Sequence, residues 1–232
     1  MTPRLLVGKV GAAGAEDFVD GLERAGHSVI ALDPADPGQV AHVDLVLIDA
    51  ADPATVRAWA ARFAPHARAE QMFIHTALLE GAQLLDEVET SRAIVMCAHQ
   101  IAPATWVTSA ADEMGEAVIA MLLAEAGATA VPIADAVRPT LAAAQELRAR
   151  QHAVLFDAHT LLNTAIPSLP APEQLVAPAP LDIPTLETLY AAIEDPGVRR
   201  LFVDLQRRTA EQAEDAAVQV WAMEKYEGRQ SR

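Results

Sequence analysis

The stretch from residue 4 to residue 33, RLLVGKVGAAGAEDFVDGLERAGHSVIALD, constrains the fold more than any other part of the chain. An apolar run precedes three closely spaced glycines, an amphipathic helix then ends at Gly26, and a second apolar run ends on Asp33. This is the order of parts in a β-α-β unit, in which a helix joins two parallel strands. A glycine-rich first turn in such a unit is typical of domains that bind a dinucleotide.

The glycine spacing departs from the usual G-x-G-x-x-G pattern. Counted from Gly11, the second glycine is replaced by Ala13, whereas an alternative frame places glycines at positions 8, 11 and 14. In either frame the backbone N–H groups of the turn are expected to approach a diphosphate at the start of the helix. The candidate cofactor-binding residues are Gly8, Gly11, Ala12, Ala13, Gly14 and Asp33.

Two acidic residues flank this turn. Asp33 ends the second strand, where a carboxylate can accept hydrogen bonds from an adenosine ribose, and no arginine follows it before Arg57. This arrangement favours NAD over NADP. Glu16 lies in the first turn of the helix, where its charge favours the helix dipole but repels a phosphate in the same place.

Strand and helix patterns alternate through the first part of the chain. The run at 43–48 is continuously apolar, as in strands buried on both faces, and further strands are expected at 72–75, 93–97 and 129–133. Helices are expected between them. One begins at the Asp52-Pro53 cap, and another spans 114–126 after a capping pattern that runs from Thr108 to Glu113. The pattern predicts an α/β fold with a doubly wound, mainly parallel sheet over residues 1–134.

The remainder, residues 135–232, is predicted to be a helical extension. A long helix is expected at 136–165 after the cap residue Asp135, and further helices at 185–193 and 198–226. Repeated prolines between 166 and 184 predict an extended connector. Because the last helix has an extensive apolar stripe, we expect a homodimer in which it packs with the long helix across a two-fold axis.

Charge and composition limit the partners. The formal net charge is −15, which makes nucleic acid an unexpected partner because phosphate-backbone binding needs clustered cations. No apolar run is long enough to span a bilayer, and the chain starts without a signal peptide, so we expect a cytoplasmic protein without a membrane partner. The lone Cys97 agrees with a reducing compartment and excludes a cysteine-rich metal site.

Two histidines are the candidate catalytic residues. His75 and His99 follow apolar strands at the edge of the sheet where open α/β folds bind ligands. An imidazole there could exchange a proton with a substrate oxygen or nitrogen, or it could only hold a loop through a hydrogen bond.

The long helix carries further polar candidates. Its arginines could hold a substrate carboxylate or could be solvated. His152 and His159 share a face, but no third ligand is evident at matching spacing, so no metal site is predicted. The arginines that could hold a substrate carboxylate are Arg138, Arg148 and Arg150.

The ordered series of motifs resembles the 6-phosphogluconate dehydrogenase-like superfamily of NAD(P)-dependent Rossmann reductases, whose relatives include pyrroline-5-carboxylate reductase and prephenate dehydrogenase. The segments that carry this resemblance, which covers about residues 4–165, are VGKVGAAG, AGHSVIALD, VDLVLIDAAD, MFIHTA, CAHQIAP and the alanine-rich long helix. The resemblance implies a dinucleotide-binding domain followed by a helical region on the substrate side. Several relatives use a catalytic lysine on the long helix, and this helix has none.

Two functions remain open from the sequence. One is an oxidoreductase that moves hydride between NAD and a small carbonyl, imine or hydroxy-acid substrate. The other is a catalytically inactive Rossmann-like binding or regulatory protein that has lost its dinucleotide.

Overall fold

The glycine-rich segment folds into the predicted β-α-β unit, formed by β1 (Leu6–Gly11), α1 (Glu16–Ala25) and β2 (Ser28–Ala31). The structure, a computed structural model, describes residues 4–169 and 181–230. The chain divides into two compact units, Met1–Arg138 and Pro139–Arg232.

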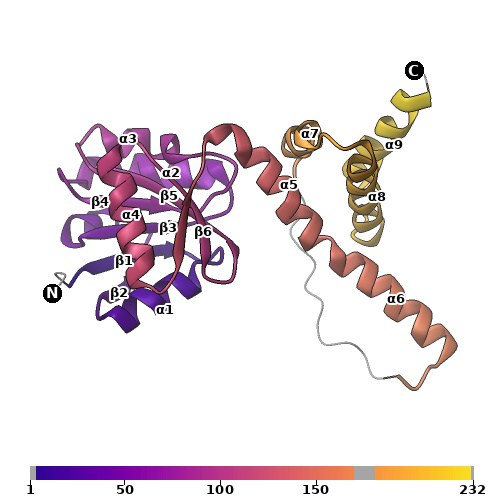
Figure 1. Cartoon of the computed structure of the whole chain (residues 1–232), viewed down its shortest axis with the longest axis horizontal. Coiled ribbons are helices and arrows are strands. Elements are labelled where there is room, and N and C mark those ends of the chain that lie inside the picture. The colour runs from indigo at the N-terminus through magenta and orange to yellow at the C-terminus, as the bar shows by residue number, and fades with distance from the viewer. Residues whose placement is uncertain (1–3, 170–180, 231–232) are drawn as a thin grey trace. The chain divides into compact units, whose positions relative to one another are not determined.

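The first unit is built on a sheet to which the described residues contribute seven strands, in the order β2-β1-β3-β4-β5-β6-β7 (Figure 1). The pair β5–β6 is antiparallel and the other neighbours are parallel, so the predicted doubly wound, mainly parallel α/β fold is confirmed. The later strands are β3 (Leu45–Asp49), β4 (Met72–His75), β5 (Ile94–Ala102), β6 (Thr105–Ala110) and β7 (Thr129–Pro132).

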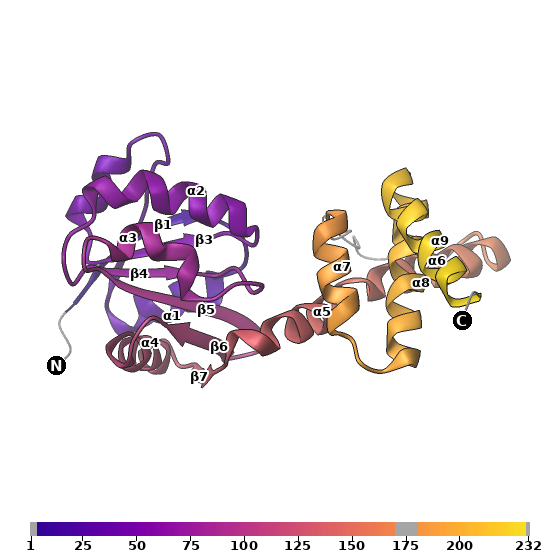
Figure 2. The ribbon, with the colours of Figure 1, turned by 90° about the horizontal axis from the view of Figure 1, so that it is seen from above.

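Helices cover both faces of this sheet (Figure 2). On one face α1 and α4 (Glu113–Glu125) enclose a core around Phe18, Leu47 and Trp106. On the other face α2 (Pro53–Phe63) and α3 (Asp86–Glu89) enclose a second core. Short 3-10 turns complete the unit at Pro37–His42, Ala64–His66, Ala82–Leu85 and Asp135–Val137.

The hairpin between β5 and β6 differs from the sequence prediction. Thr108, expected near the start of a helix, lies inside β6. The helix α4 begins at Glu113 and is capped by Asp112, whose side chain accepts a hydrogen bond from the backbone N–H of Gly115. The turn at Pro103 and Ala104 contains none of the glycine or asparagine residues that usually mark a hairpin. Ala104 adopts a positive φ of 50° there.

The second unit is helical, as predicted, but both of its long helices are interrupted. The expected helix 136–165 is two helices, α5 (Arg138–Ala149) and α6 (Gln151–Ala165), which meet at Arg150 with ψ of −7°. The expected helix 198–226 is also two helices, α8 (Pro196–Gln212) and α9 (Ala216–Gln230). Between these, Glu214 has a φ of 57°, and the Asp215 carboxylate accepts from the N–H groups that start α9.

The proline-rich connector lies largely outside the described residues, at 170–180. Its last proline, Pro184, was expected to exclude helix but lies in the first turn of α7 (Ile183–Ala192), where a missing N–H costs no helical hydrogen bond. Within the described part of the chain, none of the helices combines the length and apolar character that crossing a membrane requires.

Candidate functional site

The turn after β1 is open at the edge of the sheet where the strand order reverses, between β1 and β3. Gly11 and Gly14 have φ of 89° and 121°, which favour glycine. A Cβ on Gly11 would lie 2.2 Å from the carbonyl oxygen of Asp49, whereas a Cβ on Gly14 would meet nothing within 4 Å. Backbone therefore packs closely on one side of the turn and leaves space on the other.

The backbone N–H groups of Ala12, Ala13 and Gly14 donate no hydrogen bond to any group in the described residues. All three residues are exposed. They are therefore available to an external acceptor. Gly8 lies within β1 instead, where a Cβ would stand 2.8 Å from the side chain of Leu32, so the structure gives this glycine a packing role between neighbouring strands.

Asp33 is exposed just beyond β2, the strand that neighbours β1. One of its carboxylate oxygens accepts a hydrogen bond from the N–H of Ala35 at 2.8 Å, and its own N–H donates to the side chain of Gln39. This local turn fixes the carboxylate while leaving it in contact with solvent. Its position suits an acceptor for ribose hydroxyls.

Asp49 is a functional candidate that the sequence analysis missed. It ends β3 and is only 1% exposed. Its carboxylate accepts hydrogen bonds from the backbone N–H of Ala15 at 3.2 Å and from the Thr76 hydroxyl at 3.0 Å, and pairs with the Lys9 ammonium at 3.1 Å. The signal available in the sequence was a single charged residue at the end of an otherwise apolar strand.

Lys9 lies in β1 and pairs with Glu16 at 3.3 Å as well as with Asp49. Burial lowers the pKa of Lys9, but the hydrogen bonds and charges of the two carboxylates outweigh it and raise that pKa overall. The ammonium thus remains charged. The turn, its unbonded N–H groups and Asp33 fit an adenine dinucleotide, while two carboxylates lie beside the start of α1.

His75, the last residue of β4, is completely buried. Its Nε2 donates to the carbonyl oxygen of Gly81 at 2.8 Å, and its Nδ1 has no partner among the described residues. Burial lowers the pKa of His75 to about 4. The imidazole is therefore neutral at neutral pH and supports the loop that follows β4.

His99 lies on β5, two residues beyond Cys97, the partner of His75 in the sheet. It is partly exposed, and its Nδ1 donates to the carbonyl oxygen of Thr76 at 2.7 Å. This bond fixes the neutral tautomer with an unprotonated Nε2. Burial lowers the pKa of His99, and this effect outweighs the bond to Thr76.

Arg138, considered above as a carboxylate clamp, is instead buried and satisfied within the first unit. Its guanidinium donates to Asp135, to the Ser109 hydroxyl at 2.6 Å and to the carbonyl oxygen of Leu78 at 3.2 Å, and lies 3.4 Å from the Cys97 sulfur. Burial raises the pKa of the Cys97 thiol to about 11, which agrees with a core residue.

In the second unit the remaining arginines also have protein partners. Arg150 is buried and pairs with Glu146, whose carboxylate also accepts from Gln206 of α8 at 2.8 Å. Arg148 is exposed and donates to Gln145. The bond between Gln206 and Glu146 joins α8 to α5, whereas the bond of Arg148 lies within α5. The clamp interpretation is wrong for the two buried arginines, Arg138 and Arg150, because their guanidinium groups are enclosed by protein.

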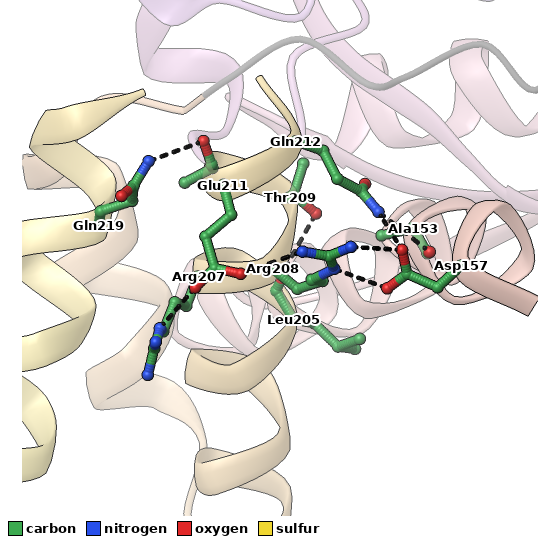
Figure 3. Close-up of polar contacts among 10 residues, drawn as sticks. Ala153, Asp157, Leu205, Arg207, Arg208, Thr209, Glu211, Gln212 and Gln219 are labelled. Atoms are coloured by element: carbon green, nitrogen blue, oxygen red, sulfur yellow. Dashed lines mark hydrogen bonds and ion pairs between the residues drawn. The ribbon is translucent and has the colours of Figure 1, made fainter. Parts of the chain in front are cut away.

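The polar face of α6 is used for contact with α8. Figure 3 shows Arg208 meeting the Asp157 carboxylate through two nitrogens, each 2.6 Å from an oxygen, with Gln212 as a third donor. Nearby, His159 accepts from Asn163, and His152 donates to a backbone carbonyl. No three His, Cys, Asp or Glu side chains in the described residues gather closely enough to hold a metal ion.

Comparison with known proteins follows this division of the chain. The family model of 6-phosphogluconate dehydrogenase C-terminal domain-like proteins matches residues 134–225. No curated protein matches the chain by sequence.

Solved structures match across both units. They include 3-hydroxyisobutyrate dehydrogenase of Mycobacterium tuberculosis, solved with L-serine, at 17% identity and a TM-score of 0.51, over 99% of this chain and 94% of that one. Prephenate dehydrogenase of A. aeolicus, solved with hydroxyphenyl propionate and NAD+, has 14% identity and a TM-score of 0.51, over 100% and 93% of the two chains. A putative prephenate dehydrogenase of Corynebacterium glutamicum has 14% identity and a TM-score of 0.50, over 98% and 80%.

At these identities the likeness to solved structures shows the fold, and the family match covers the helical region. Residues 134–225 are similar to 6-phosphogluconate dehydrogenase C-terminal domain-like proteins, and the chain as a whole has the fold of these dehydrogenase structures.

Proposed function

We propose that the chain binds NAD at the turn between β1 and α1 and acts as an oxidoreductase on a small carbonyl, imine or hydroxy-acid substrate. The observation that carries this proposal is the open turn itself. Three consecutive backbone N–H groups, those of Ala12, Ala13 and Gly14, have no acceptor among the described residues, and Asp33 lies just beyond β2, the strand next to β1. The prephenate dehydrogenase with the same fold was solved with NAD+, which supports the choice of cofactor.

The residues expected to hold the dinucleotide have distinct tasks. The turn N–H groups would donate to the diphosphate, and the Asp33 carboxylate would accept from the ribose hydroxyls. A 2′-phosphate would place negative charge against Asp33, so NAD is favoured over NADP. The bound cofactor would supply hydride transfer, while the protein positions it.

His99 is the residue we assign to proton transfer. Its neutral form presents an unprotonated Nε2 that can accept the hydroxyl proton of a hydroxy acid during oxidation. Since burial lowers the pKa of His99, this base form predominates at neutral pH, and reduction would gain from lower pH. His75, the other candidate, serves by holding the Gly81 loop.

The test of cofactor binding is calorimetric titration of NAD+ and NADH into the wild-type chain, Asp33→Ala and Asp36→Ala. Asp36 is an exposed carboxylate in the same loop that bonds to Gln39, so its variant is the matched control. Loss of two hydrogen bonds to a charged acceptor should weaken binding by about 10- to 100-fold in Asp33→Ala. Equal affinities in both variants would contradict the proposed ribose contact.

The test of catalysis uses His99→Asn, because an asparagine amide can replace the donor to the Thr76 carbonyl without supplying a base. We expect this variant to keep its NAD affinity and to lose the pH dependence of kcat in the oxidation direction. Wild-type turnover with a pH profile identical to that of the variant would remove His99 from the mechanism.

The alternative is a binding or regulatory protein that has lost the dinucleotide. It is favoured by the absence of lysine from α5 and α6, and by the two carboxylates beside the turn. Failure of NAD+ and NADH to bind at millimolar concentration would select it.

In either function the chain is expected to form a homodimer through its C-terminal helices. Support comes from α6, whose described side chains include large apolar groups that are half or more exposed: Val154, Leu155, Phe156, Leu161 and Leu162. A surface of this kind on a helix calls for a partner.

A further inference from the structure

At the N-terminus of α1, a carboxylate of the chain itself, that of Asp49, accepts a hydrogen bond from the backbone. The carboxylate of Asp49, at the end of β3, accepts the hydrogen bond of the Ala15 N–H immediately before α1 begins. Asp49 is buried and is held from a second side by the Thr76 hydroxyl of the loop after β4. Backbone N–H groups at such a helix start are the ones that bind phosphate in nucleotide sites.

The charges around this point do not balance. Lys9 contributes one positive charge, and Asp49 and Glu16, both within salt-bridge distance of it, contribute two negative charges. The group therefore has a net charge of one negative beside the turn. A dinucleotide diphosphate brought to the Ala12–Gly14 amides would meet this negative charge.

We infer that Asp49 is a built-in competitor of the diphosphate, which limits the affinity of the site for dinucleotides without affecting recognition of the adenosine. The inference rests on the proposed dinucleotide site and names the residue that sets its affinity. The negative charge of Asp49 repels the diphosphate, and the single positive charge of Lys9 offsets only one of the two negative charges of Asp49 and Glu16. Replacing it by asparagine keeps the shape and an acceptor oxygen for the Ala15 N–H, removes one negative charge and leaves Lys9 to face the ligand.

The same strand offers a matched control at its other end. Asp44 directly precedes β3, accepts a hydrogen bond from the backbone N–H of Leu6 at 2.9 Å and pairs with Arg68 at 3.1 Å. The carboxylate of Asp44 thus contacts one backbone N–H and one cation, as the carboxylate of Asp49 does. Asp44 and Asp49 are five positions apart along the strand, so they lie roughly 16 Å from each other, beyond the Debye length at physiological salt.

The experiment is calorimetric titration of adenosine, ADP-ribose and NAD+ into the full wild-type chain, Asp49→Asn and Asp44→Asn. We expect Asp49→Asn to bind ADP-ribose and NAD+ about tenfold more tightly than wild type, with adenosine unchanged, because one nearby charge is removed. Asp44→Asn should match wild type for all three ligands. An unchanged or lower NAD+ affinity in Asp49→Asn would overturn the inference.

A second measurement on the wild-type chain does not depend on a variant folding. Raising the salt concentration from about 0.01 M to about 0.5 M screens surface charges. If Asp49 and Glu16 oppose the diphosphate, NAD+ affinity rises with salt, and the slope is reduced in Glu16→Gln, which changes an exposed side chain. Affinity that falls with salt in the wild-type chain would refute the inference even if Asp49→Asn does not fold.

The outcomes separate this inference from the proposed function. Binding of NAD+ by wild type and tighter binding by Asp49→Asn support both. Binding by Asp49→Asn alone supports the inference and shows that the native chain has lost its cofactor. Equal binding by wild type and Asp49→Asn supports the proposed function and removes the inference, and no binding by either protein removes both.

Discussion

The guanidinium group of Arg138 lies 3.4 Å from the sulfur of Cys97, and both side chains are fully buried. Arg138 is the last residue of the first unit and the first of α5. Its other donors are satisfied by Asp135, Ser109 and the Leu78 carbonyl. An arginine that could have been a substrate clamp therefore fastens the end of the sheet unit to β6 and to the loop after β4.

Replacing Arg138 by methionine should destabilise the chain strongly. The variant leaves the Ser109 hydroxyl and the Leu78 carbonyl without their donor, and breaking a buried charged network in this way typically costs about 3–5 kcal/mol. Urea denaturation measures this loss. Arg148→Met is the control, because Arg148 is exposed on the same helix and its replacement should change the unfolding free energy by less than about 0.5 kcal/mol. Equal stabilities of the two variants would contradict the role given to Arg138.

Elements marked by local chemistry were predictable from the sequence. Asp52 and Pro53 were expected to start a helix, and the Asp52 side chain does accept from the N–H groups of Ala54 and Thr55. His75 was correctly expected at the end of a strand. In each case the deciding interaction lies within a few residues, so a short stretch of sequence contains all the information.

Features that depend on distant residues were not predictable. Asp49 acquires its importance from Ala15, 34 positions away, and from Thr76 in a third segment. The break between α8 and α9 was hidden because the apolar stripe continues across Glu214 in both helices. Likewise, the end of the strand at His75 could be predicted from the sequence, but the burial of its ring could not, because distant residues cover it.

His75 should make stability depend on pH in mildly acidic solution. Burial holds its pKa at about 4 in the folded chain, below the ordinary value of 6.5. The unfolded chain therefore binds the proton first, and stability is complete above about pH 6.5 and falls as the pH decreases to about 4, by about 3 kcal/mol in all. In His75→Gln, which keeps a donor for the Gly81 carbonyl, this part of the slope should disappear.

The measurement is urea denaturation at a series of pH values for wild type, His75→Gln and His66→Gln. His66 is exposed, so its replacement controls for the loss of a histidine. The lowered pKa of His99 acts in the same direction, so a smaller slope should remain in His75→Gln. A slope unchanged from wild type would show that His75 is not buried in its neutral form.

Gly11→Ala should damage the turn more than Gly14→Ala. Both positions have positive φ, which costs an alanine about 1–2 kcal/mol. Only at Gly11 would the new methyl group also collide with backbone, at 2.2 Å from the Asp49 carbonyl oxygen. Thermal or urea unfolding should therefore show the larger loss in Gly11→Ala, and an equal loss in the two variants would mean that β1 and β3 are not packed as closely as the structure shows.

The homodimer can be tested on α6 without altering the sheet unit. Leu161 is 72% exposed, and burying such a side chain in an interface contributes about 1.5–3 kcal/mol. Leu161→Glu replaces this contribution with a charge that must be desolvated. Sedimentation equilibrium should therefore show a dimer dissociation constant that is at least about 100-fold higher than in the wild-type protein. Met121→Glu, on an exposed position of α4 in the first unit, adds the same charge and should leave the dimer intact. Several large apolar side chains of α6 are exposed within the described chain, and a dimer would cover them. If the wild-type protein sediments as a monomer at micromolar concentration, these side chains stay in water and the dimer is ruled out.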